Sequence, residues 1–68
     1  MNYNEDELIL IKELESKRVD KYNINLIMET LKTEKQLSKM IDYMISIREL
    51  NIPEDLIVEI ADSISIEE

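Results

Sequence analysis

The most abundant ionisable side chains in this sequence are carboxylates, which are candidates for acid–base chemistry. The 68-residue chain holds 16 Asp and Glu residues, 8 Lys and Arg residues, and no His or Cys, which gives a formal net charge of −8. A pair of carboxylates acts as acid and base only when the two groups meet in a walled cleft. Asp6-Glu7 and Glu54-Asp55 are adjacent in the sequence, and adjacent residues of a helix do not face each other.

The missing residue types disfavour most catalytic and cofactor chemistry. Without His or Cys the chain lacks the usual nucleophile and base pair, and without Gly it lacks the loops that cradle phosphates. No acidic run has the spacing of a calcium-binding loop. We therefore expect a protein that is not an enzyme, with no catalytic, cofactor-binding or metal-binding residues, no cofactor and no small-molecule substrate.

The acidic residues gather towards the C-terminal end. The segment 49–68 contains seven acids and no base. Asp55, Glu59 and Asp62 are spaced i, i+4 and i+7, so they share one face of a helix. Two interpretations stay open: a tail that only keeps the protein soluble, and a surface that selects a basic protein partner. Under the second interpretation, these three residues form the acidic partner surface.

Capping signals predict helices as the elements that position these residues. Asn4 and Glu7 form a capping-box pattern that starts a helix running to about residue 20. Residues 22–28 alternate like a strand, but the apolar spacing over 24–31 favours a short helix capped by Asn23. The inward residues of the first helix are expected to be Leu8, Leu10, Ile11 and Leu14.

Two more helices are predicted in the second half of the chain. Thr33 and Gln36 form another capping-box pattern, so a third helix begins near residue 34, and Asn51 is a candidate for its end. Pro53 suits the first turn of a fourth helix, where acids are favourable to the helix dipole. The inner residues of this fourth helix are expected to be Leu56, Ile57, Ile60 and Ile64.

The third helix is apolar over more than one face. At about 100° per residue its apolar arc covers roughly 220°, which exceeds what packing against a single layer needs. Tyr43, Ile47 and Leu50 follow i, i+4 and i+7 and continue the surface on which Met40 lies. A domain this small usually needs additional stabilisation from a disulfide, a metal ion or a second subunit. Of these three, the composition favours a second subunit. We expect these four residues to form the interface of a homodimer. The alternative is that the first helix of the same chain covers this surface.

The segment 48–57, RELNIPEDLI, resembles the helical hook by which SinI-type antirepressors pair with their repressors. In both, an Asn-Ile turn leads through Pro and acids into a second helix. The match covers about a sixth of the chain and lacks one turn residue. The resemblance implies a pair of helices that works by binding another protein.

These observations predict an all-α fold: one domain over residues 1–68, a small dimeric bundle of three to four short helices, frayed at 1–4 and 65–68. The expected function is that of a small non-catalytic regulator or adaptor that binds itself and an unidentified basic protein. The alternative is a phage or mobile-element inhibitor that mimics DNA and blocks a nucleic-acid-binding protein. Direct nucleic-acid binding is disfavoured by the net charge. The acidic start and short apolar runs predict no membrane contact and a cytoplasmic location, bacterial or in the host of a phage.

Overall fold

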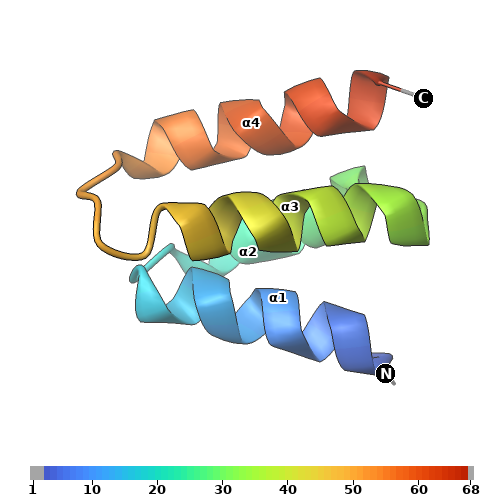
Figure 1. Cartoon of the computed structure of the whole chain (residues 1–68), viewed down its shortest axis with the longest axis horizontal. Coiled ribbons are helices and arrows are strands. Elements are labelled where there is room, and N and C mark those ends of the chain that lie inside the picture. Colours follow the sequence, from blue (N-terminus) through green and yellow to red (C-terminus); the bar gives the residue numbers. More distant parts are fainter. Residues whose placement is uncertain (1–2, 68) are drawn as a thin grey trace.

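The computed structural model describes residues 3–67, and within them it contains four helices and no strand (Figure 1). This confirms the all-α prediction at its upper count of helices. No helix in the described part of the chain is long and apolar enough to cross a membrane. The helices are α1 (Glu5–Ser16), α2 (Lys21–Thr30), α3 (Glu34–Ser46) and α4 (Glu54–Ile66).

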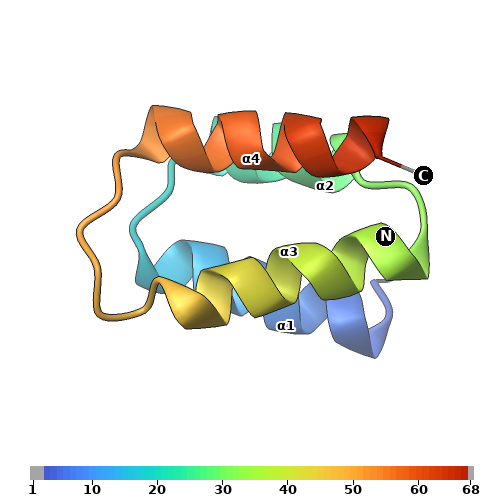
Figure 2. The same ribbon diagram turned by 45° about the horizontal axis from the view of Figure 1, so that its top comes forward.

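The four helices form two layers of two (Figure 2). One layer consists of α1 and α3, and the other of α2 and α4; the helices within each layer run parallel (Figures 1 and 2). Across the layers α1 packs on α2 and α3 packs on α4, so each of these consecutive pairs is an antiparallel hairpin. Although α2 and α3 are consecutive, they lie on a diagonal and make no close backbone contact. The molecule is therefore two helical hairpins packed against each other.

The core lies between the two layers and takes residues from every helix. None of the described polar or charged side chains is buried. A core made of apolar side chains from every helix is typical of a small helical bundle whose apolar stripes face inward. The largest fully buried side chains are Leu10, Leu14, Ile27, Met40, Met44 and Ile57.

The start of α1 follows the predicted capping box, but its end does not. Asn4 Oδ1 accepts a hydrogen bond from Glu7 N–H at 2.8 Å, and Glu7 Oε1 accepts one from the Asn4 N–H. The helix stops at Ser16, about four residues before the predicted end, because Arg18 adopts a left-handed conformation with φ of 61°. The Val19 N–H then bonds to the carbonyl of Leu14, a closure normally built with Gly.

Residues 22–28 are helical, so the ambiguity with a strand is resolved in favour of the predicted helix. The predicted cap was wrong, however. Asp20 caps α2 by accepting a hydrogen bond from Tyr22 N–H at 3.0 Å, and α2 begins at Lys21. Asn23 therefore lies inside the first turn of α2 instead of preceding it. Its side chain is turned to α4 and donates to Glu54.

The beginning of α3 at Glu34 and the capping box of Thr33 with Gln36 are confirmed. The predicted end at Asn51 was wrong, since α3 ends at Ser46 and residues 47–53 form a loop. Lys17 holds this loop from the end of α1. Its Nζ donates to the carbonyl oxygens of Arg48 at 2.9 Å and of Leu50 at 2.5 Å, and these two bonds tie the loop to the end of α1.

Pro53 is the N-cap of α4, one position before the first turn in which it was expected. The inward residues predicted for α1 and α4 are confirmed except at two positions. Leu8 of α1 and Leu56 of α4 were expected to point inward, but both are exposed. The buried residues of α4 also include Ala61, which was not predicted, together with Ile57 and Ile64.

The predicted fraying falls partly on residues outside the described part of the chain, namely Met1, Asn2 and Glu68. Among the described residues, Asn4 makes both hydrogen bonds of its capping box. At the other end α4 extends to Ile66.

Candidate protein-interaction surface

The outer side of α4 is a continuous acidic strip. Asp55, Glu59 and Asp62 are all exposed, as their i, i+4, i+7 spacing predicts for one helix face. The opposite side of α4 is anchored in the core by Ile57 and Ile64. The three carboxylates are therefore presented to solvent by a helix with a fixed orientation. We call Asp55, Glu59 and Asp62 the acidic strip.

Glu54 is turned away from the acidic strip and joins α4 to α2. Its Oε2 accepts a hydrogen bond from the Asp20 N–H at 3.0 Å and a second from the Asn23 side-chain amide. Asp20 is the N-cap of α2 and Asn23 lies in its first turn, so the N-terminal ends of the two parallel helices are held side by side. Sequence periodicity could not show this contact, because the partners are more than 30 residues apart.

The predicted homodimer interface does not lie on one accessible surface. Met40 is completely buried and Ile47 is only 4% exposed, and both belong to the core of the chain itself. Tyr43 is half-buried, whereas Leu50 is 53% exposed. Because α3 ends at Ser46, Leu50 lies in the loop and does not extend a helical ridge from Tyr43. Of the four predicted residues, only Tyr43 and Leu50 are accessible to a partner.

Exposed apolar side chains lie beside the acidic strip. Leu26 of α2 is three residues after Asn23, and Val58 of α4 is four residues after Glu54. Since Asn23 and Glu54 are bonded, helical periodicity brings Leu26 and Val58 to the same outer side of the α2–α4 layer. Leu26 is 38% exposed and Val58 is half-buried. With Tyr22, which is 72% exposed, and the acidic strip, they form what we call the α2–α4 face.

A second group of exposed apolar residues follows the line between α1 and α3. Glu13 of α1 forms an ion pair with Arg48, which follows the end of α3. Ile9 precedes Glu13 by four residues, and Ile41 and Ile45 precede Arg48 by seven and three, so these isoleucines border the same line. Ile9 and Ile45 are exposed, and Ile41 is half-buried. The hydrogen bond from Arg48 lowers the pKa of Glu13, against a smaller opposing effect of burial.

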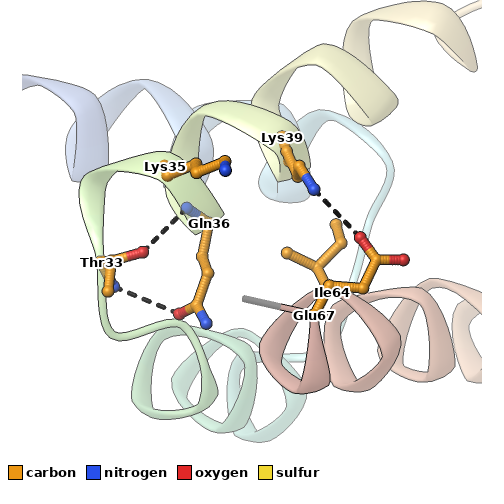
Figure 3. Close-up of a pocket in the computed structure, with 6 residues that line it drawn as sticks. All are labelled: Thr33, Lys35, Gln36, Lys39, Ile64 and Glu67. Atoms are coloured by element: carbon orange, nitrogen blue, oxygen red, sulfur yellow. Dashed lines mark hydrogen bonds and ion pairs between the residues drawn. The ribbon is translucent and has the colours of Figure 1, made fainter.

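A cavity of about 370 Å³ opens where the start of α3 meets the end of α4 (Figure 3). Its polar side chains are largely engaged in contacts that close this end of the bundle. Lys39 forms an ion pair with Glu67 at 3.0 Å. Gln36 accepts from the Lys32 and Thr33 N–H groups and donates to the carbonyl of Ser65. No group of three potential metal ligands occurs among residues 3–67.

No protein-family model, no curated protein and no solved structure matches this chain.

Proposed function

We propose that this protein is a small non-catalytic regulator or adaptor that acts by binding another protein through the acidic end of the chain and an apolar helix face. The observation that carries the proposal is the acidic strip, three exposed carboxylates on a helix whose other side is fixed in the core. A rigid helix presents its charges without an entropic cost of ordering. A surface whose charges all have one sign favours a partner of the opposite sign. We place this activity in the cytoplasm, since a sequence without cysteine suits a reducing compartment.

The test compares two variants with the same change of net charge. One is Asp55→Asn, Glu59→Gln, Asp62→Asn in the acidic strip. The matched control is Glu5→Gln, Glu15→Gln, Asp42→Asn, which changes three exposed acids of α1 and α3. Proteins captured from the native host by the wild-type chain are identified, and their affinities for all three forms are measured. We expect the strip variant to bind at least ten-fold more weakly and the control to bind like the wild type. Equal affinities would contradict the proposal.

Self-association is the second part of the proposal. Its support is the small size of the domain and the exposure of the apolar side chain of Leu50. We expect a dimer at micromolar concentration in sedimentation equilibrium, and a folded monomer after Leu50→Asp. Leu50 is suited to this test because it is exposed, whereas a charge at the buried Ile47 would unfold the chain. A wild-type chain that is monomeric at hundreds of micromolar would contradict self-association.

A DNA-mimicking inhibitor is the second candidate function. It is favoured by the absence of any base from the segment 49–68, which leaves the acidic strip as a surface of one sign. A mimic binds a nucleic-acid-binding protein largely by charge, so its affinity falls steeply as salt is raised. An adaptor that also buries apolar side chains keeps most of its affinity. A salt titration of the captured partner therefore separates the two functions.

A further inference from the structure

We propose that the α2–α4 face binds a basic amphipathic helix of the partner protein. This inference rests on the proposed function and names the chemistry of the partner. The face combines two features that such a helix would complement. One is a set of apolar side chains, the exposed Tyr22 and Leu26 with the half-buried Val58, and the other is the acidic strip. The partner helix would place its apolar stripe on the first group and its lysines and arginines against the second.

The charges on this face are of one sign because the nearby base of α2 is turned elsewhere. Lys21 lines a cavity on the α1 side of α2 together with Ile11 and Ile24. Glu54, the remaining acid in the first turn of α4, faces α2 through its hydrogen bonds to Asp20 and Asn23. The outer surface of the layer thus carries the acidic strip, with the apolar side chains beside it.

The dimensions of the layer match a short helix. At about 1.5 Å per residue, the 13 residues of α4 extend over roughly 20 Å. A partner helix of three to four turns covers that length and presents apolar residues at i, i+3 or i+4, and i+7. Lysine and arginine at the edge of such a stripe lie their methylene stems on apolar surface while their charged ends reach the carboxylates.

Charge also argues against two other occupants of this face. Nucleic acid is repelled, because its phosphates have the same sign as the acidic strip. A second copy of the chain would bring the strip against its own image across a two-fold axis, and like charges in contact oppose such a pairing. A basic helix is the occupant that satisfies both the apolar and the charged side chains.

The experiment uses three synthetic 14-residue peptides and the full-length, isotope-labelled chain. The first peptide consists of Leu and Lys with Leu at helical spacing. The second has the same composition in an order that destroys the apolar stripe. The third keeps the Leu stripe and replaces every Lys by Glu. Amide chemical shifts locate binding, and titration gives each Kd.

We expect the Leu–Lys helix to shift amides of 22–30 and 54–62 and to bind at least ten-fold more tightly than either control peptide. Leu26→Ser and the strip variant Asp55→Asn, Glu59→Gln, Asp62→Asn should each weaken binding at least ten-fold. Leu8→Ser, which changes an exposed leucine of α1, should leave it unchanged.

Four outcomes would overturn the inference. These are shifts centred on α1 and α3, equal binding of the shuffled peptide, equal binding of the Leu–Glu peptide, and no binding at all. Equal binding of the shuffled peptide would mean that charge alone attracts, as for a DNA mimic. The proposed function would survive any of these outcomes if the captured partner still required the acidic strip, so the two failures are distinguishable.

Discussion

Arg18 shows what the absence of glycine does to this chain. The residue that follows a helix often adopts a left-handed conformation, which glycine accepts most readily. Here Arg18 adopts this conformation with φ of 61°. The chain turns at this point, and the next residue, Val19, is buried. A side chain with a Cβ atom destabilises this conformation by about 1–2 kcal/mol.

We expect Arg18→Gly to raise the free energy of unfolding by up to about 1 kcal/mol, because relief of the left-handed strain exceeds the added entropy of the unfolded chain. A gain of that size raises Tm by about 4–8 °C in a domain this small. Thermal unfolding followed by circular dichroism measures it. The matched control is Glu15→Gly, which places glycine within the helix and should lower stability by about 1 kcal/mol. A loss of stability in both variants would contradict the role assigned to Arg18.

Glu13 makes the stability of the fold depend on pH. The hydrogen bond from Arg48 lowers the pKa of the Glu13 carboxyl in the folded protein. The stabilisation is therefore fully present above the pKa of the unfolded chain, about 4.3, and is lost as pH falls through the lower folded value. We expect Glu13→Gln to be less stable than the wild type at pH 7, and the difference to shrink as pH falls below about 4.

Denaturant unfolding at a series of pH values measures this difference, and NMR titration of the carboxyl gives the pKa directly. A Glu13 pKa at or above its usual value would show that the ion pair is not formed in solution.

At the scale of the helices, local signals in the sequence predicted the starts of helices better than their ends. The capping boxes that open α1 and α3 depend only on residues three apart, and both were predicted. The ends of α1 and α3 were not, because the first depends on an arginine in a glycine conformation and the second leads into a loop that is held by the distant Lys17. Long-range contacts of this kind leave no periodic pattern.

Of the candidate site, only the part that lies on a single helix was predictable from the sequence. The acidic strip lies on one helix, so its spacing identified it. The α2–α4 face combines residues from two helices about 30 positions apart, and it became visible only through the contact of Asn23 with Glu54. Two residues of the predicted dimer surface, Met40 and Ile47, are buried in the core of their own chain, because helical angles do not tell which side of an apolar arc the chain itself covers.

The contact between α2 and α4 can be tested at Glu54. We expect Glu54→Ala to lower the free energy of unfolding by about 1–2 kcal/mol, because two hydrogen bonds to the first turn of α2 are lost. Asp55→Ala is the matched control. Like Glu54, Asp55 lies in the first turn of α4, where an acid interacts favourably with the helix dipole, an interaction of about 0.3–1 kcal/mol. Urea unfolding of both variants gives the difference. Equal losses would show that Glu54 does not join the two helices in solution.

At the scale of the whole molecule, the packing joins helices that are not neighbours in sequence. Each layer is built from one helix of the first hairpin and one of the second, so the core closes only when the hairpins meet. Buried residues of both hairpins, such as Leu14 and Met44, belong to one cluster. Neither hairpin has a core of its own, and short helices without tertiary packing are marginal in water.

We expect two fragments, residues 1–32 and 33–68, to be largely unfolded when separate and to regain helix when mixed. The break falls in the loop between α2 and α3, two helices that make no close backbone contact with each other. Circular dichroism of each fragment and of the equimolar mixture measures the gain. Full helicity of either fragment alone would show that a single hairpin is stable.

The diagonal arrangement of α2 and α3 also means that the partner of each hairpin need not belong to the same molecule. Only the three residues 31–33 connect the hairpins, and if they extend, the first hairpin of one chain can pack on the second hairpin of another. Such an exchange reproduces twice the core contacts between the helices of the two hairpins and creates a domain-swapped dimer without any additional apolar surface. In this fold, therefore, a dimer can be assembled entirely from the interior of the monomer.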